Sequence, residues 1–494
     1  MTYVMTFLAV LFILCHAAVS LRAYHIFQLN SYKYGVQMAW LSRNISGAWS
    51  PYSRKAKKPI VYTPRIIRMF ASHFFILLLG VAVSLHFGIV YLAVFAALFA
   101  LLAPLFPLLS SIVNAPYERA INQWYIRDAK RILKNASRLR VIGVTGSYGK
   151  TSVKNFLHGV LSSKFNCLMT PESYNTTLGV VMTIRSSLTP AHDIFICEMG
   201  ARRRGDIKEI CDIINPDFGV ITSIGEQHLE SFGTISNITE TKFELSAALS
   251  GDGILFLNAD NEFIEEYIGK NSCHLPKTVV KWSMSNGPER GRENTYRAFD
   301  LSVSVKGSAF TVAFPDGEER ALTTSLIGVP NVTNILAAIA VADTLGVARD
   351  AIALSVTRLK PVPHRLQLTR MNGLTIIDDA YNSNPVGAAL ALSALALFDG
   401  YFKILVTPGM VELGEMQDEL NERFGAQAAL VADSVILVGE RQTKSVFAGL
   451  RGEGFDANKI FVTESLSSAF ERINLTDDGR PKIVLLENDL PDNY

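Results

Sequence analysis

A glycine-rich turn that carries a lysine and a threonine lies between a predicted strand, residues 141–144, and a predicted helix, residues 153–161. In such a turn the backbone N–H groups and the helix N-terminus bind phosphate, the lysine neutralises the outer phosphates, and the threonine hydroxyl can ligate Mg²⁺. The strict spacing of a phosphate-binding loop is not met, because Val144 stands where its first glycine belongs. The alternative is a chance glycine-rich turn. The predicted phosphate site comprises Thr145, Gly146, Ser147, Tyr148, Gly149, Lys150, Thr151 and Ser152.

Two further polar residues lie where predicted strands end. Glu198 ends the apolar run 193–198, and His228 follows the apolar run 218–225. Ligands of an open α/β sheet collect beyond the carboxyl ends of its parallel strands, so we expect both residues to share one crevice with the turn. A carboxylate and an imidazole beside a triphosphate can ligate Mg²⁺, directly or through water. Taken alone, Glu198 could equally cap a helix, and His228 could be an ordinary loop histidine.

The first 117 residues have the composition of a membrane region. They contain 9 Lys and Arg residues, and the first acidic residue of the chain is Glu118. The run 2–21 is apolar over 20 residues, and the run 70–113 has no charged residue over 44. At about 1.5 Å of helix per residue and ~30 Å of hydrocarbon, these runs predict spans over 2–21, 70–90 and 92–113. We therefore predict a helical membrane region over residues 1–135. A cleaved signal peptide is the alternative for the first run.

Residues 22–69, between the first two predicted spans, form a basic loop without an acid. Positive charge beside spans marks the cytoplasmic side, so this loop and everything after residue 114 are predicted to lie in the cytoplasm, where ATP is available. The basic residues of the loop, together with its aromatic residues, also suit a surface of anionic lipid headgroups, with a topology signal alone as the alternative. These aromatic residues are Tyr32, Tyr34, Trp40 and Trp49.

The rest of the chain has a different charge balance. Residues 118–494 carry 38 Lys and Arg against 45 Asp and Glu, a net charge of −7, which excludes nucleic-acid binding by charge. This part is long enough for two domains with their own cores. The 5 cysteines form no Cys-x-x-Cys pair, so neither a zinc site nor a disulfide framework is indicated. Reduced thiols agree with a cytoplasmic location.

Seven motifs occur in the order that is seen in the Mur ligases. The resemblance spans residues 139–494 and implies an α/β fold, with a P-loop central ATP-binding domain over 136–364 and a Rossmann-like C-terminal domain over 365–494 behind the membrane region. Residues 378–385 and 409–414 most resemble the MurF branch, which adds D-alanyl-D-alanine to a UDP-linked muramoyl tripeptide. The other motifs lie at 145–151, 174–179, 198–201, 225–230 and 331–334.

The resemblance implies roles for individual residues. Lys150 neutralises ATP phosphates, while Thr151, Glu198 and His228 ligate Mg²⁺. Lys242, fourteen residues after His228, matches the lysine that several Mur ligases carbamylate into a ligand for a second Mg²⁺. The alternative is an ordinary surface lysine on a helix. Further implied contacts are Asn331 and Asn334 with adenine, Asp379 with ribose, Arg365 with phosphate, and Asn175, Thr176, Asn382 and Asn384 with the substrate.

The implied function is an ATP-dependent amide ligase of peptidoglycan precursor synthesis, anchored in a bacterial membrane, with a peptide-bearing cell-wall precursor and D-alanyl-D-alanine as partners. Three departures from the family pattern occur. Membrane spans occupy the place of the usual front domain that holds the uridine nucleotide, so UDP recognition is open and a lipid-linked acceptor is an alternative. Tyr148 stands where Asn or Ser is frequent, and His364 and Pro330 replace a Gly and a His. A polyglutamate synthase and a nucleotide sensor without ligase activity are the remaining alternatives.

Overall fold

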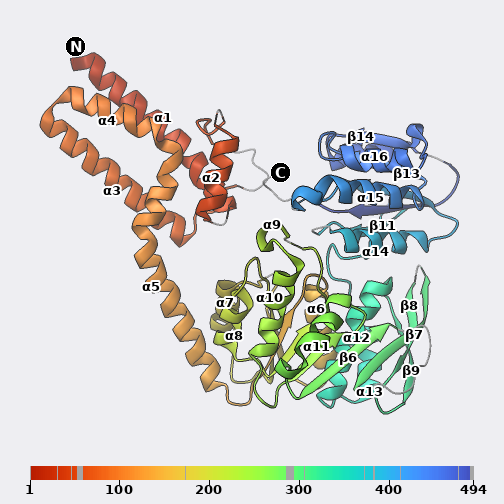
Figure 1. Cartoon of the computed structure of the whole chain (residues 1–494). Helices are drawn as coiled ribbons and strands as arrows, with labels where there is room; N and C mark the ends of the chain where they lie inside the picture. Colours follow the sequence, from red (N-terminus) through yellow and green to blue (C-terminus); the bar gives the residue numbers. More distant parts are fainter. Residues whose placement is uncertain are drawn as a thin grey trace. The chain divides into compact units, whose positions relative to one another are not determined.

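The computed structural model describes the chain apart from residues 1, 31, 46, 53–58, 173, 228, 285–293, 305, 372, 382–383, 412, 477 and 490–494. It divides into two compact units (Figure 1), one comprising Met1–Tyr125 and the other Ile126–Leu490. The first unit is helical, and the second contains both β-sheets.

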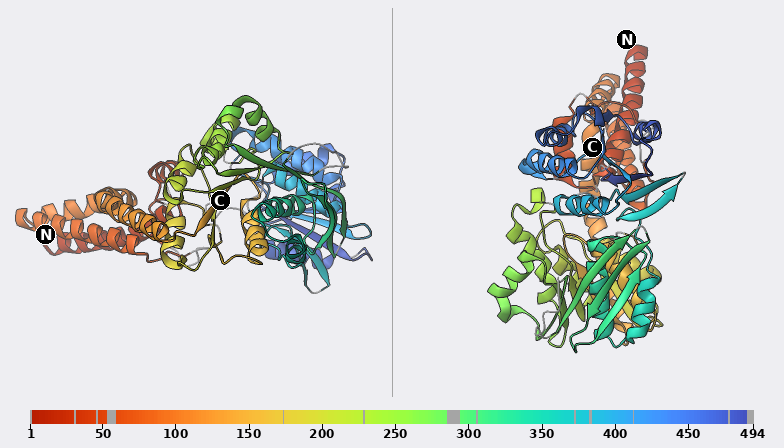
Figure 2. Two further views of the ribbon diagram at one scale, coloured as in Figure 1. Left: turned by 90° about the horizontal axis from the view of Figure 1, so that it is seen from below. Right: turned by 90° about the vertical axis from the view of Figure 1, so that its right-hand side faces the viewer.

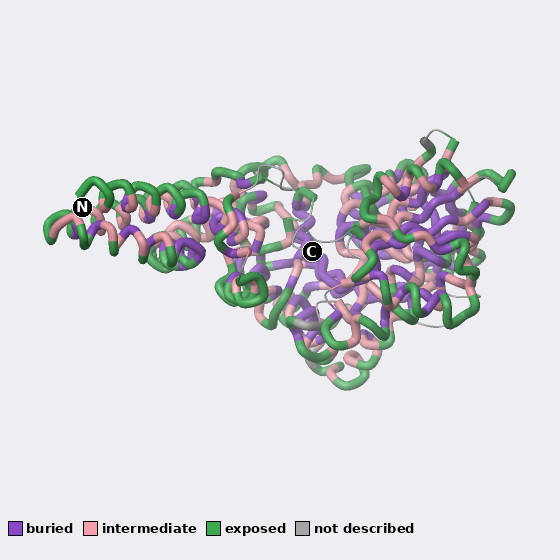
Figure 3. Tube along the Cα trace, turned by 90° about the horizontal axis from the view of Figure 1, so that it is seen from above, coloured by how far each residue is buried: buried purple, intermediate pink, exposed green. Residues whose placement is uncertain are grey.

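The N-terminal helices are long and apolar. Two of them, α1 and α3, are long and apolar enough to cross a membrane, and a third candidate span is the pair formed by α4 and the helical segment that follows it, bent by 58°. Exposed residues follow these helices over much of their length (Figure 3) and include Phe7, Phe74 and Phe75, as expected where helices face lipid. The helices are α1 (Thr2–Leu29), α2 (Tyr34–Arg43), α3 (Pro64–Phe87), α4 (Ile89–Leu101), the 3₁₀ turn η1 (Ala103–Leu105) and α5 (Phe106–Asn135).

The helix boundaries differ from those of the predicted spans in three places. The first helix continues to Leu29, and the basic loop contains α2, so residues 22–69 are partly helical. The second helix begins at Pro64 because the side chain of Thr63 accepts a hydrogen bond from the backbone N–H of Ile66 and caps it. The third predicted span is broken after Leu101, where a 3₁₀ turn containing a proline interrupts the helix.

Polar side chains inside the apolar bundle bond one another. His16 Nε2 on α1 lies 2.6 Å from His73 Nε2 on α3, and His16 Nδ1 lies 2.7 Å from the carbonyl oxygen of Phe99. The hydroxyl of Tyr24 donates to the hydroxyl of Ser110 at 2.7 Å. These buried groups are therefore satisfied within the bundle, which is the condition for polar atoms away from water.

The first sheet has nine strands in the order β2-β3-β1-β4-β5-β6-β7-β8-β9, parallel from β2 to β7 and antiparallel from β7 to β9. Helices lie on both sides of its green strands in the right view of Figure 2. Its strands are β1 (Arg140–Thr145), β2 (Cys167–Met169), β3 (Ile194–Glu198), β4 (Phe218–Ile221), β5 (Ile254–Asn258), β6 (Thr278–Met284), β7 (Thr295–Ser304), β8 (Gly307–Ala313) and β9 (Glu319–Thr324). The helices of this domain are α6 (Lys150–Leu161), α7 (Thr177–Ser187), α8 (Asp206–Ile214), α9 (Leu229–Phe232), α10 (Ile235–Ala247), α11 (Glu262–Asn271), α12 (Val329–Thr344) and α13 (Arg349–Thr357), with a 3₁₀ turn, η2 (Ser272–His274).

Strands β1, β3, β4 and β5 are mostly apolar along their whole length because both faces of the sheet are buried there.

The second sheet has six strands in the order β10-β11-β15-β12-β13-β14, all parallel except β10. This confirms the predicted Rossmann-like fold of the C-terminal domain. The strands are β10 (Gln367–Met371), β11 (Leu374–Asp379), β12 (Phe402–Thr407), β13 (Ser434–Val438), β14 (Ile460–Thr463) and β15 (Lys482–Glu487). The helices are α14 (Pro385–Ala396), α15 (Gln417–Ala429), α16 (Lys444–Gly452) and α17 (Leu466–Leu475), with 3₁₀ turns η3 (Gly414–Met416) and η4 (Ala457–Lys459). The predicted domain boundary at 364 falls in the segment between α13 and β10.

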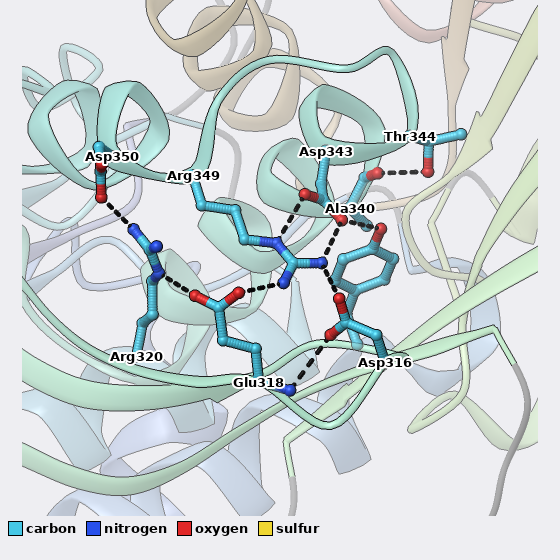
Figure 4. A network of polar contacts seen from close by, with 9 residues as sticks. Asp316, Glu318, Arg320, Ala340, Asp343, Thr344, Arg349 and Asp350 are labelled. Carbon is cyan, nitrogen blue, oxygen red and sulfur yellow. Dashed lines mark hydrogen bonds and ion pairs between the residues drawn. The ribbon is translucent and has the colours of Figure 1, made fainter.

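A network of charged side chains centred on Arg349 ties the β8–β9 hairpin to the helices behind it (Figure 4). The Arg349 guanidinium lies 3.0 Å from Asp343 on α12, 2.8 Å from Asp316 and 2.5 Å from Glu318 in the hairpin turn. It also lies 4.0 Å from the ring centre of Phe314. Because the Arg349 side chain is only 19% exposed, these contacts are less screened by water than ordinary surface ion pairs.

Replacing Arg349 by alanine is expected to lower the free energy of unfolding by about 1–2 kcal/mol, because three carboxylates lose a shared partner and the ring contact is lost. Urea or thermal unfolding of the protein in detergent measures the change. The control is Lys270→Ala, which removes an exposed pair with Glu266 and should leave the unfolding midpoint unchanged. Equal losses in the two variants would contradict this role for Arg349.

Candidate active site

The phosphate turn stands at the carboxyl end of a central strand. β1 lies between β3 and β4, ends at Thr145, and is followed by the turn and by α6, as predicted. Gly146 and Gly149 have φ values of 150° and 78°, which side chains disfavour. A Cβ on Gly146 would stand 2.1 Å from the hydroxyl of Thr222, and one on Gly149 would stand 2.6 Å from the amide oxygen of Asn334. The turn therefore requires glycine at both positions.

Lys150 is the first residue of α6 and folds back over the turn. Its ammonium donates to the carbonyl oxygens of Gly146 at 2.7 Å and Ser147 at 2.8 Å. Burial lowers the pKa of Lys150 to about 8, and the nearby Glu198 carboxylate opposes that shift. The side chain thus remains largely cationic at neutral pH and lies where it can neutralise phosphate.

Glu198 ends β3 and is buried beside the turn. Its Oε1 accepts hydrogen bonds from the Thr151 hydroxyl and from the Asn175 amide, each at 3.1 Å. Its Oε2 has no hydrogen bond from any described residue, although the Lys154 ammonium lies 3.1 Å away as an ion pair.

These residues fit a magnesium ion. Two oxygens bound side by side to octahedral Mg²⁺ at about 2.1 Å stand about 3 Å apart, which is close to the separation of Thr151 Oγ1 and Glu198 Oε1. A buried carboxylate oxygen without a hydrogen-bond donor is a further available ligand. Within the described part of the chain, no three His, Cys, Asp or Glu side chains cluster as a metal site. His228, the predicted imidazole ligand, lies outside the described residues.

Lys242 lies on α10 with only 3% of its surface exposed, so its interpretation as an ordinary surface lysine was wrong. Burial, and secondly the positive charge of Lys150, lower the pKa of Lys242 to about 7. A substantial fraction of its amine is therefore uncharged at neutral pH, which is the form that reacts with carbon dioxide. Carbamylation of Lys242 stays a prediction.

Arg365 brings a second cation to the turn from the segment before β10. One guanidinium nitrogen lies 3.4 Å from the Thr151 hydroxyl, and the group stands over the ring of Tyr381 at 4.6 Å. Asp379 ends β11, and its carboxylate accepts a hydrogen bond from the backbone N–H of Leu366 at 3.0 Å. Burial raises the pKa of Asp379 to about 6. Because the Arg365 guanidinium lies beside Thr151 of the turn, it is placed where it can contact phosphate.

A cavity of about 1050 Å³ opens beside the turn and has walls from both sheets' domains. Tyr148, Gly149 and Asn334 line it from the first domain, and Leu390, Met410 and Phe424 line it from the second. Its size suits a nucleotide base and sugar.

Asn331, in contrast, is buried and donates its amide to the carbonyl of Ile327 at 2.9 Å, so the prediction that it contacts adenine is not supported by its position.

Of the predicted substrate residues, Asn175 belongs to the site, because its side-chain amide donates a hydrogen bond to Glu198. Thr176 caps the N-terminus of α7, and Asn384 caps the N-terminus of α14, so both side chains are engaged in local structure. Asn382 lies outside the described residues. Thr145 donates its hydroxyl to the carbonyl of Met199 at 3.0 Å, and Ser152 is buried in α6.

Sequence reasoning missed two features of the site. Lys154 was not identified, although its position four residues after Lys150 on a helix is a signal that both lie on one face. The wall that α15 contributes to the cavity was also missed, because Phe424 lies outside the motifs and is an apolar residue on a helix that carries no signal of its own.

Lys242 is expected to form a carbamate at and above neutral pH and to lose it as the pH falls below about 7, because only the uncharged amine attacks CO₂ and releases a proton. Carbon-13 NMR of the protein in labelled bicarbonate at pH 6 and pH 8 measures this. The control is Lys242→Met, which should lack the carbamate resonance. A resonance that persists in this variant, or that does not depend on pH, would contradict the prediction.

Known proteins share this arrangement. The Mur ligase middle domain matches residues 144–342, and the glutamate ligase domain of the Mur ligases matches residues 364–486. The UDP-N-acetylmuramoyl-tripeptide–D-alanyl-D-alanine ligase of Bacillus subtilis is 34% identical over 58% of this chain and 60% of its own length. The Escherichia coli enzyme of the same name is 31% identical over 71% of this chain and 77% of its own length. The structure of MurF ligase from Thermotoga maritima in complex with ADP superposes with a TM-score of 0.65 at 26% identity, covering 74% of this chain and 80% of that one.

The chain thus spans less than two thirds of the Bacillus relative, and the matched regions contain the phosphate turn, Glu198, Lys242 and Arg365. The order of the parallel strands, the site at their carboxyl ends and these matches show together that the chain belongs to the Mur ligase family, and the relatives named here are MurF enzymes.

Proposed function

We propose that the chain is an ATP-dependent amide ligase of the MurF type that joins a peptide carboxylate of a cell-wall precursor to D-alanyl-D-alanine. The observation that carries this proposal is the convergence of the phosphate turn, Lys150 and the Thr151–Glu198 pair beside one cavity. The buried Lys242 favours this function over a nucleotide sensor, because binding alone does not require another amine beside Lys150.

The chemistry has two steps. A carboxylate oxygen of the acceptor attacks the γ-phosphorus of ATP, and the bond from that phosphorus to the β-phosphate oxygen breaks. ADP departs, and the acceptor becomes an acyl phosphate. The amine of the second substrate then attacks the acyl carbon, phosphate departs, and the amine loses a proton as the amide forms. When bound, Mg²⁺ supplies charge neutralisation at the transferring phosphoryl group.

The protein's own groups bind, orient and exclude water. Backbone N–H groups of the turn hold phosphate. Lys150 neutralises the negative charge that develops on the leaving ADP. The Asn175 amide and Lys154 fix the orientation of the Glu198 carboxylate. Arg365 and the cavity wall from the second domain lie beside the turn. By keeping water from the turn, they would protect an acyl phosphate from hydrolysis.

The acceptor peptide could be attached to a nucleotide or to a lipid, and this attached group is here called its carrier. The described residues before β1 form only helices, so no α/β domain precedes the catalytic part within the described chain. We propose a UDP-linked muramoyl peptide as the acceptor, as the names of the relatives suggest. The apolar helices favour a lipid-linked acceptor as the second candidate, because a substrate held in the membrane needs no soluble carrier site.

Comparing the two acceptors in detergent tests the function. We expect amide formation from D-alanyl-D-alanine and ATP with one of them, read by mass spectrometry. Lys150→Ala should lower the rate at least a hundredfold, because a cation that neutralises the transferring phosphate is lost. Turnover at the full rate in Lys150→Ala would sink the ligase proposal. Addition of several glutamates to the acceptor, when glutamate is supplied as the amine in place of D-alanyl-D-alanine, would point to the polyglutamate alternative.

We further propose that the chain crosses the membrane more than once and holds its catalytic part in the cytoplasm. Charge bias in residues 22–69 and the two apolar helices support this arrangement. A green fluorescent protein fused to the C-terminus should therefore fluoresce, and alkaline phosphatase at the same place should stay inactive, because it needs disulfides that form outside the cytoplasm. The opposite pair of results would reverse the topology, and recovery of the intact fusion in a soluble fraction would exclude the spans.

A further inference from the structure

A buried lysine holds the carboxylate that the site offers to a metal ion. Lys154 lies one turn after Lys150 on α6, and its side chain is fully buried. Its ammonium lies 3.1 Å from Oε2 of Glu198, while Oε1 bonds Thr151 and Asn175. Glu198 therefore has its charge balanced by a neighbour inside the protein.

Lys154 also reaches the loop that carries Asn175. Its ammonium donates to the backbone carbonyl of Glu172, a residue with a left-handed φ of 41°. The same loop is fixed at its start, where Thr170 accepts a hydrogen bond from the backbone N–H of Glu198 at 3.1 Å. One ammonium thus joins three pieces of the site: helix α6, the end of β3 and the loop 170–176.

We propose that Lys154 is a positioning residue that competes with the divalent ion for Glu198, so that Mg²⁺ binds firmly only together with the phosphates of a nucleotide. The proposal rests on the proposed function for the presence of the ion. Because the ammonium contacts one oxygen of the carboxylate, an ion ligated by that carboxylate has a positive charge as a near neighbour, and repulsion between cations is strong in a site that is largely removed from water. Nucleotide phosphates add negative charge and offset the repulsion.

Two variants separate charge from shape. Lys154→Met removes the charge and keeps an unbranched side chain that is one atom shorter, and Lys154→Gln, which is equally short, retains an N–H donor. We expect either variant to bind Mn²⁺ at least tenfold more tightly than the wild type in the absence of nucleotide, measured by the electron paramagnetic resonance signal of free Mn²⁺. The gain in Mn²⁺ affinity that ADP brings should shrink in the same variants, because the phosphates then have no repulsion from Lys154 to offset.

The matched control is Lys164→Met. The Lys164 ammonium also donates to backbone carbonyls, those of Leu345 and Gly346, so its loss should leave Mn²⁺ affinity unchanged. The proposal is overturned if both Lys154 variants bind Mn²⁺ no more tightly than the wild type, or if Lys164→Met shows the same gain. Failure of both Lys154 variants to fold would assign the ammonium to packing alone and would overturn it too.

The binding experiment needs no turnover, so it separates this inference from the proposed function. Competition for Mn²⁺ in a protein that forms no amide with any tested acceptor would contradict the proposed function and leave the role of Lys154 standing. Amide formation by a protein whose Lys154 variants show no gain in Mn²⁺ affinity would support the proposed function and overturn the role of Lys154.

Discussion

Burying one carboxylate at the end of a central strand is the constraint on which the catalytic part of this chain depends. An ionised side chain leaves water only at a cost of several kcal/mol unless charges and hydrogen bonds replace its hydration. Glu198 meets that condition through Lys154, Thr151 and Asn175, which come from two different segments of the chain. Val144 on β1 pairs with Glu198 on β3, so strand register sets the carboxylate beside the start of the turn. A slip by one residue would turn Glu198 to the other face of the sheet and disassemble the site.

Several cations gather around this carboxylate. Lys150, Lys154 and Arg365 all lie close to Glu198 or to its partner Thr151, and repulsion from Lys150 helps to lower the pKa of Lys242. Burial works in the same direction, because it penalises the charged form of an amine. Asp206 and Glu244 oppose the shift at Lys242, so acidic groups offset part of this positive charge. Under the proposed function, nucleotide phosphates would bind beside these cations, and carbamylation of Lys242 would replace one cation with an anion.

Local patterns predict the part of this site that lies within one segment, and they miss the contacts that form between segments. The strand, turn and helix around Lys150 follow from β-branched residues and glycines within twenty positions, and the structure contains them as predicted. The ion pair between Lys154 and Glu198 depends on how α6 packs against β3, for which the sequence has no local signal. Asn331 is a further example, because the motif gives no sign that its amide N–H bonds the carbonyl of Ile327 just before α12, while its contact with adenine stays a prediction. The helix ends in the apolar region also escaped prediction, since hydropathy locates apolar residues and says little about capping by Thr63 or the break after Leu101.

The contacts that this site makes explain how apolar helices can precede a Mur ligase core without contributing to its site. The described groups that converge on the turn are cations, a hydroxyl and a carboxylate, which under the proposed function would contact ATP, its metal ion and the reacting end of the acceptor. The carrier of the acceptor, whether a nucleotide or a lipid, lies at the other end of that molecule and needs no group from the turn. A carrier can therefore be exchanged by replacing the segment that binds it, while Lys150, Glu198 and Arg365 keep their positions. The two compact units of this chain have the organisation that such an exchange requires, because the core with both sheets forms a compact unit that does not include the apolar helices α1 to α4.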